Sequence, residues 1–179
     1  HPLTGLDFCT DYEIQIATAC GDNWSDFSSL ITFTSGGCDL NVQLKVWLEG
    51  AYVTSINSMT NTLQNNGFIP LNQPYSTEPW YYTGTESVAS VTNLPNYTTD
   101  WVLIELRNEN DPTILIAQKV GFLLQDGSVV GIEAASTGIV FADVSPGNYY
   151  IVVRHRNHLA AMSSAPVLVP NDGAPYDFT

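Results

Sequence analysis

The sequence predicts an all-β protein, built as an antiparallel β-sandwich with a β-hairpin in front of it. Short runs in which apolar and polar residues alternate recur along most of the 179 residues, as in strands with one buried face. Turn residues separate these runs at short intervals, which is typical of sandwiches. The length suits one full-sized domain with an additional piece, or two small domains. With 44% hydrophobic residues, the chain can form a packed core.

Residues 1–37 predict the hairpin. Its first strand, near residues 12–19, places apolar side chains such as Tyr12 and Ile14 on one face. A Gly-Asp-Asn-Trp-Ser-Asp loop leads to the second strand, near residues 28–35. Two strands alone cannot bury one of their faces. We therefore expect either that upstream sequence of a longer precursor covers the inner face of this hairpin, or that another molecule does.

The three cysteines predict one disulfide bond and one cysteine without a partner in this chain, in an oxidising compartment. Pairing the hairpin strands end to end places residue 12 opposite residue 35 and Cys9 opposite Cys38, so we expect these two cysteines to be bonded. Cys20 lies about 30 Å from Cys9 at ~3.3 Å per residue, which is too far for a bond. It is free, or paired with sequence outside this chain.

Residues 38–179 predict the sandwich, with a first strand at 42–48 whose even-numbered residues are apolar. The connection that follows, residues 50–86, has no sustained period and contains several X-Pro breakers. Connections of this length are often functional or form a docked cover. Within it, residues 58–64 predict one or two helical turns.

The remaining strands follow from short apolar runs and the turns between them. Asp126-Gly127 is a strong hairpin signal. The longest well-patterned strand lies within residues 147–158, which also hold two of the five basic residues and two of the three histidines. The predicted strands are 87–92, 101–107, 113–119, 121–125, 128–132, 138–143, the strand that contains Tyr149, 166–169 and 176–179.

Two motifs resemble those of known families. Leu6, Thr10 and Tyr12 form a Leu-x-x-x-Thr-x-Tyr corner, which resembles the last two strands of fibronectin type III domains. The segment Gly138-Ile-Val-Phe-Ala-Asp-Val-Ser-Pro-Gly-Asn-Tyr149 is similar to the core of carboxypeptidase-regulatory-like and transthyretin-like domains. The resemblance implies an Ig-like or prealbumin-like sandwich, preceded by the C-terminal hairpin of a fibronectin type III-like domain.

A broader likeness covers most of residues 39–179. Leu-Glu-Gly-x-Tyr at 48–52, the strand at 100–107 and Arg-His-Arg-Asn-His-Leu at 154–159 follow the hairpin in this order. The order is similar to a module of large secreted surface proteins of Bacteroidota-type bacteria. This resemblance implies export and a place in a multidomain chain, without implying a known reaction.

Charged residues gather on two strands that we expect to be neighbours. If these strands pair, Asp100 and Glu105 can face Arg154 and Arg156, with Arg107 beside them. Cross-strand pairs of opposite charge contribute about 0.2–1 kcal/mol each. We predict a structural ion-pair ladder on the outer face of the sheet. The alternative is a recognition site for an acidic or carbohydrate ligand.

His155 and His158 stand three residues apart at a strand end, and as metal ligands they would need a third group, for which Asp100 is the candidate. We expect a hydrogen-bonded structural role instead, with a metal-dependent enzyme as the alternative. The sequence has no Gly-x-Ser-x-Gly, no phosphate-binding glycine loop and no spacing that identifies a catalytic carboxylate pair. We therefore predict no enzyme activity, no cofactor and no metal.

Aromatic residues give the best argument for binding. Trp80, Tyr81 and Tyr82, with Trp47 and Tyr75, could stack on sugar rings if the long connection presents them on the surface. The alternatives are that they pack the connection over an open face of the sheet, or that they anchor protein–protein contacts.

The charge balance narrows the partners. A net charge of −13 repels nucleic acid and anionic lipid, and no apolar run reaches the roughly 20 residues that span a bilayer. We expect a non-catalytic structural or adhesion module of a secreted surface protein or extracellular polymer, located at the cell surface. Its partners would be other protein modules, further copies of itself or surface glycans. The alternative is a carbohydrate-binding accessory module of a secreted hydrolase. Since the chain starts at His1 without a signal peptide, we expect a piece of a longer precursor.

Overall fold

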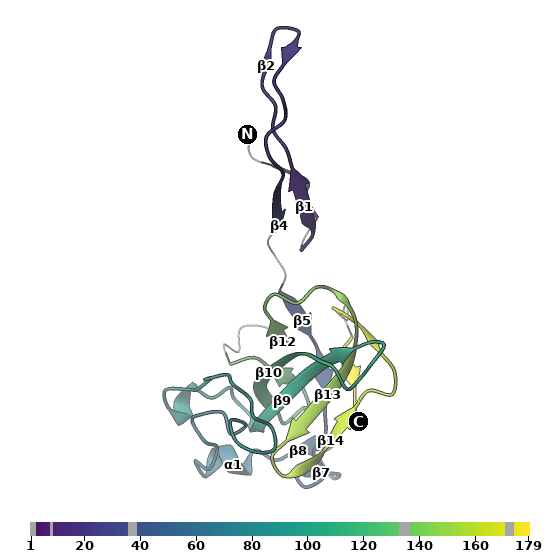
Figure 1. The fold of residues 1–179 in the computed structure, drawn as a ribbon. Helices are drawn as coiled ribbons and strands as arrows, with labels where there is room; N and C mark the ends of the chain where they lie inside the picture. The colour runs from purple at the N-terminus through teal and green to yellow at the C-terminus, as the bar shows by residue number, and fades with distance from the viewer. Residues whose placement is uncertain (1–2, 8, 36–38, 133–136, 171–173) are drawn as a thin grey trace.

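The computed structural model describes residues 3–7, 9–35, 39–132, 137–170 and 174–179 (Figure 1). Most of its regular structure is β-strand, which confirms the predicted all-β class. The helical segments α1 (Thr62–Asn65) and η1 (Val91–Asn93) are single turns. Within the described ranges, no helix has the length and apolar character needed to cross a bilayer.

The strands of the hairpin project away from the sandwich (Figure 1), and the segment before them contacts it where Cys9 Sγ lies 3.4 Å from Ser145 Oγ. Tyr12 pairs with Phe33, two positions away from the expected partner at 35. A two-residue turn at Gly21 and Asp22, with Gly21 at φ 61°, replaces the longer expected loop and places Ala19 opposite Trp24. The register then shifts by two residues between this outer pair and Ile14, so that Tyr12 lies opposite Phe33. The antiparallel pairs are β1 (Asp11–Ile14) with β4 (Ile31–Thr34) and, farther out, β2 (Ala19–Cys20) with β3 (Asn23–Trp24).

A larger antiparallel sheet forms the centre of the molecule. Its strand order is β11-β10-β9-β13-β14, and β15 pairs with the beginning of β13. The long strands β9, β10 and β13 lie side by side in the middle (Figure 1). The bounds are β9 (Thr98–Asn108), β10 (Leu115–Leu124), β11 (Val129–Val130), β13 (Gly147–His155), β14 (His158–Met162) and β15 (Val167–Val169).

Several predicted strands needed correction. The segments 113–119 and 121–125 are one strand, β10, which runs through Gly121. Glycine is required there by close packing, since an added Cβ would lie 2.5 Å from the Val130 carbonyl oxygen. Residues 87–92 form no strand beyond a single bridge between Ser87 and Asn72, and then enter η1.

A second layer packs on one face of the central sheet. As predicted, the even-numbered residues from Val42 to Leu48 are buried, and together with Leu40 they pack against Val102, Ile104 and Leu106 of β9. One pair in this layer departs from the antiparallel expectation. The C-terminal strand β16 runs alongside β6 in the same direction, so this pair is parallel. The layer contains β5 (Leu40–Val42), β6 (Leu44–Lys45), β12 (Ile139–Phe141) and β16 (Tyr176–Asp177).

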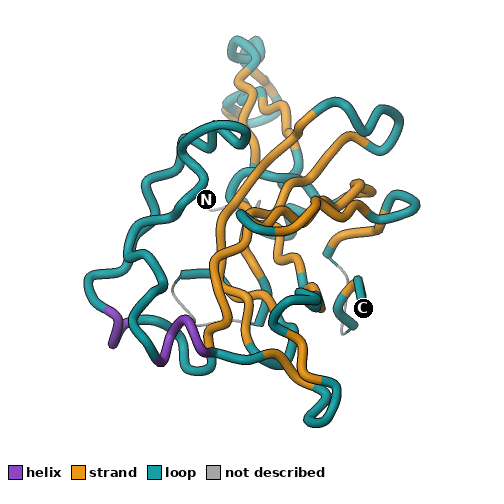
Figure 2. Tube along the Cα trace, turned by 90° about the horizontal axis from the view of Figure 1, so that it is seen from below, coloured by secondary structure: helices purple, strands orange, loops and turns teal. Residues whose placement is uncertain are grey.

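The opposite face of the sheet is covered by the long connection. After the short pair β7 (Tyr52–Val53) and β8 (Ser58–Met59), the segment 62–94, here termed the cover, lies along one side of the sheet (Figure 2). A second buried cluster forms beneath it, and β9 is therefore buried on both faces. Its members are Ile69, Tyr75, Tyr82, Val88, Leu94, Trp101, Leu103, Val120, Phe122 and Val130.

Candidate functional site

Two buried carboxylates organise the polar residues along β9 and β13. Glu105 accepts hydrogen bonds from Arg107, with Nη2 and Oε2 2.6 Å apart, and from Arg154 on the neighbouring strand. Asp100 accepts two from Arg156, at 2.9 Å from Nε and 3.1 Å from Nη2. The structure therefore brings together all five charged residues that the sequence singled out.

These ion pairs do not form the expected ladder on an outer face. The Asp100 side chain is 1% exposed and that of Glu105 is 6% exposed, because both faces of β9 are covered. Burial by itself would raise the pKa of Asp100. Hydrogen bonds from His155 and from the Trp101 backbone N–H, together with the charge of Arg156, outweigh burial and lower that pKa below its ordinary value. Asp100 is thus an ionised carboxylate in the interior.

The two histidines extend this network in a defined order. The Asn157 backbone N–H donates to Nδ1 of His155 at 3.2 Å, so that this nitrogen carries no proton and Nε2 carries it. Nε2 of His155 then donates to Asp100 at 3.1 Å. Since Nδ1 of His158 lies 2.8 Å from Nδ1 of His155, it must be the donor of that bond. The second ring nitrogen of His158, Nε2, is left as an acceptor.

Electrostatics keep this acceptor available at neutral pH. Burial, and then the neighbouring His155, lower the pKa of His158, and the charges of Glu49 and Asp100 only partly oppose them. His158 is therefore neutral under ordinary conditions. The short contact between its Nδ1 and Nδ1 of His155 is a hydrogen bond. In the described residues, no group of three or more His, Cys, Asp or Glu side chains is placed to hold a metal.

A cavity of about 420 Å³ opens beside His158. Thr99 also lines it, is 3% exposed, and has an Oγ1 without a hydrogen-bond partner among the described residues. This histidine cavity is lined by Leu48, Gly50, Ala51, Thr60, Thr62, Leu63, Thr99, Asp100, His155, Asn157 and His158.

The five aromatic residues predicted to bind ligands do not share one surface. Tyr75 and Tyr82 are buried in the cluster beneath the cover, and Trp80 packs edge-on against Tyr75 with 5.2 Å between ring centroids. Trp47 belongs to the other layer, where Lys45 lies 5.2 Å from its ring centroid. Tyr81 alone among the five is strongly exposed, at 64%. These side chains mainly fix the connection to the sheet.

Trp80 does border a shallow hollow of about 480 Å³ next to the β13–β14 turn. Arg154 and Arg156 line the same hollow, but their guanidinium groups are engaged by Glu105 and Asp100. The two arginines therefore have little hydrogen-bonding capacity left for a ligand in this hollow.

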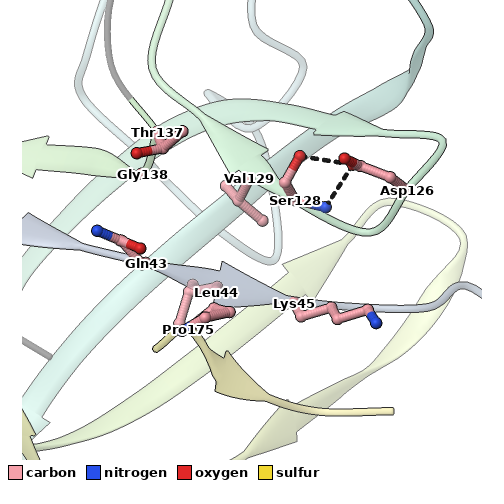
Figure 3. Close-up of a pocket in the computed structure, with 9 residues that line it drawn as sticks. All are labelled: Gln43, Leu44, Lys45, Asp126, Ser128, Val129, Thr137, Gly138 and Pro175. Carbon is pink, nitrogen blue, oxygen red and sulfur yellow. Dashed lines mark hydrogen bonds between the residues drawn. The ribbon is translucent and has the colours of Figure 1, made fainter. Parts of the chain in front are cut away.

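A further pocket, of about 340 Å³, lies between β6 and the turn that joins β10 to β11 (Figure 3). Asp126 points toward Ser128 and accepts hydrogen bonds from its backbone N–H at 2.9 Å and its hydroxyl at 2.6 Å (Figure 3). This carboxylate closes the turn that the sequence predicted. Lys45 lines the other side of the pocket.

Tyr12 of the hairpin bonds back to the backbone five residues upstream. The Tyr12 hydroxyl accepts a hydrogen bond from the Asp7 backbone N–H at 2.8 Å, and Tyr12 stacks on Phe33 across the strands. Cys20 is exposed and free. Cys38 lies outside the described residues, so the predicted Cys9–Cys38 bond stays a prediction.

Apolar side chains line the hairpin without cover. Large side chains there are 52–71% exposed, far more than the residues of the sandwich core. They are Ile16, Trp24, Phe27, Leu30 and Ile31.

Comparison of the chain with protein-family models, curated proteins and solved structures finds no match. The function is therefore argued from the residues themselves. Sequence reasoning missed Thr99, because nothing in a run of strand residues signals that one hydroxyl will lack a partner after folding.

Proposed function

We propose that the chain is a non-catalytic structural and adhesion module of a secreted surface protein or extracellular polymer. It acts through contacts between its hairpin and other protein modules outside the cell. Under this proposal, the chain combines the end of a fibronectin type III-like unit with a carboxypeptidase-regulatory-like or transthyretin-like sandwich.

The exposed apolar surface of the hairpin carries the proposal. Trp24 is 71% exposed and Phe27 69%, while the sandwich behind them has two well-buried clusters of its own. The hairpin contains only two strands side by side, and both present open edges. A partner that adds strands would satisfy the backbone groups of those edges and bury the apolar side chains.

Charge favours one kind of partner. Within residues 3–35 there is no lysine or arginine, so two hairpins of this chain would repel each other. The partner that best fits the exposed surface of the hairpin is the apolar sheet of another β-sandwich module, with lysine or arginine at the rim of that sheet. The acids of this segment are Asp7, Asp11, Glu13, Asp22 and Asp26.

Hydrogen exchange tests the proposal with a defined probe. The probe is a fibronectin type III sandwich that lacks its last two strands and carries lysines at its rim. We expect the hairpin amides to exchange quickly in the chain alone and to become protected when the probe is added. All samples carry Cys20→Ser, which prevents bonds between chains through the exposed thiol.

A double substitution, Trp24→Ser with Phe27→Ser, should abolish this protection. Leu159→Ser is the matched control, because Leu159 is 96% exposed but lies on β14 and not on the hairpin. Hairpin amides that stay unprotected with the probe would contradict the proposal. If sedimentation shows self-association that requires Trp24 and Phe27, the partner is a second copy and the charge argument fails.

The carbohydrate-binding alternative loses its expected platform. Tyr75 and Tyr82 are buried and Trp47 lies in the other layer, so the five aromatic residues offer no continuous stacking surface.

A further inference from the structure

We propose that the histidine cavity binds a neutral hexose through His158 and Thr99. This inference goes beyond the proposed module function and does not depend on the hairpin. It assigns a ligand class to the cavity bordered by the hydrogen-bond chain that runs from Asp100 through His155 to His158.

The first support is the acceptor that the network creates. The bonds from Asn157 to His155, and from His158 to His155, fix the order of donors and leave Nε2 of His158 unprotonated. This nitrogen faces Gly50, since a Cβ added to Gly50 would lie 3.5 Å from it, and both residues line the cavity. Nε2 of His158 is therefore positioned to accept a hydrogen bond from a ligand hydroxyl.

The second, independent support is Thr99. Buried hydroxyl groups nearly always have a hydrogen-bond partner, and leaving one unpaired is costly. The Oγ1 of Thr99 is buried beside this cavity and has no partner in the described part of the chain. A rotation of the Thr99 side chain about χ1 that turns Oγ1 toward the cavity would let a ligand hydroxyl bond with it and remove that cost.

The lining specifies a neutral ligand. Asp100 is the only charged side chain in the lining, and Arg156 and His155 already engage it. The remaining surface combines threonine hydroxyls with the apolar groups of Leu48, Ala51 and Leu63. Hydroxyls that can donate and accept, on a ring with apolar C–H faces, match this surface, and about 420 Å³ lies in the range of small-ligand pockets.

The test titrates glucose, galactose and mannose into the full chain, with glucuronate as the charged counterpart, and follows the imidazole nitrogen shifts of His158 by NMR. We expect at least one neutral hexose to shift the Nε2 resonance in a saturable way, and glucuronate to bind more weakly. Lowering the pH should abolish binding, because protonated Nε2 cannot accept. The charged and titratable groups that act on the protonation of His158 are His155, Glu49 and Asp100. Asp100 is itself paired with Arg156.

Matched variants separate binding from folding. Thr99→Val should weaken binding roughly five- to tenfold while leaving stability unchanged or raised, since it removes a buried hydroxyl that has no partner. Gly50→Ala should block the cavity at Nε2 of His158 without backbone strain. His158→Gln keeps an acceptor near the Nε2 position, whereas His158→Asn keeps only the donor to His155, so Asn should lose more affinity.

Leu159→Ala is the control, because its side chain is exposed and does not line the histidine cavity. The inference is overturned if none of the three hexoses shifts the His158 resonance, or if Thr99→Val and Gly50→Ala bind as well as the unmodified chain. Tighter binding of glucuronate than of every neutral hexose would also overturn it.

Discussion

The hydroxyl of Tyr75 donates a hydrogen bond to the backbone carbonyl of Trp101 at 2.8 Å, and both side chains are fully buried. The indole Nε1 of Trp101 in turn donates to the Pro70 carbonyl at 2.8 Å. The cover and β9 are thus joined by bonds that run in both directions. This explains why a connection with little regular structure can close one face of the sheet.

Tyr75→Phe tests this attachment. The ring would remain in place, but the Trp101 carbonyl would lose a buried donor, and we expect a loss of about 1–2 kcal/mol in the free energy of unfolding. Urea denaturation measures it. Tyr81→Phe is the control and should change nothing, since Tyr81 is 64% exposed. Equal effects of the two substitutions would mean that the Tyr75 bond does not hold the cover.

Arg156→Gln should be more harmful than Arg154→Gln. Asp100 would remain buried without a guanidinium partner and keep only the hydrogen bonds from His155 and the Trp101 backbone N–H, whereas Glu105 would still be paired with Arg107. We expect Arg156→Gln to cost about 3 kcal/mol, at the lower end for breaking a buried pair, because Arg156 is itself 26% exposed. Arg154→Gln should cost clearly less. Chemical denaturation of the two variants decides the order, and a reversed order would contradict it.

Acidification should lower stability in two steps. The pKa of His158 lies below its ordinary 6.5 in the folded chain, so the unfolded chain takes up the proton first, and stability falls as the pH drops through and below 6.5. The pKa of Asp100 is lowered from its ordinary 3.8 in the folded chain. Ionised Asp100 therefore stabilises the fold above pH 3.8, and this contribution is lost as the pH falls farther. Denaturation across this pH range measures both steps. His158→Asn should remove only the first, and an unchanged first step would refute its assignment.

Gly138→Ala should damage the contact between β12 and β5. Gly138 has φ 109°, and an added Cβ would lie 2.4 Å from Oδ1 of Asn41 and 2.9 Å from the Val42 carbonyl oxygen. We expect a loss of about 3 kcal/mol, measured as a lower melting temperature and urea midpoint. Gly131→Ala is the control, since its Cβ would meet nothing within 4 Å, and it should change stability by less than about 0.5 kcal/mol.

The parts of the fold that the sequence predicted are those where one face of a strand is buried. Alternation at 42–48 and the Asp126-Gly127 turn follow directly from local chemistry. The pairing of Asp100 with Arg156 was also predictable, because the chain has few bases and Arg156 directly follows β13, the neighbour of β9.

Other features depend on contacts that no local pattern reveals. β14 was missed because His158–Met162 has little β-strand character of its own and pairs only because a tight turn brings it back along β13. The burial of Tyr75 and Tyr82 was not decided by sequence, since residues 50–86 have no period that marks a buried face. For the candidate site, the histidines were visible in the sequence, whereas the order of their protons and the lone hydroxyl of Thr99 emerge only in three dimensions.

Every basic side chain of the chain is already engaged. Arg107 and Arg154 bind Glu105, Arg156 binds Asp100, Lys119 lies 3.0 Å from Glu86, and Lys45 packs over Trp47. Carboxylates therefore dominate the electrostatic field around the molecule, and their mutual repulsion opposes the association of two copies. Near pH 4, close to the isoelectric point of about 4.1, the net charge vanishes and this barrier to aggregation disappears with it, just above the range in which Asp100 loses its charge. Acid would thus bring molecules together while it loosens each of them.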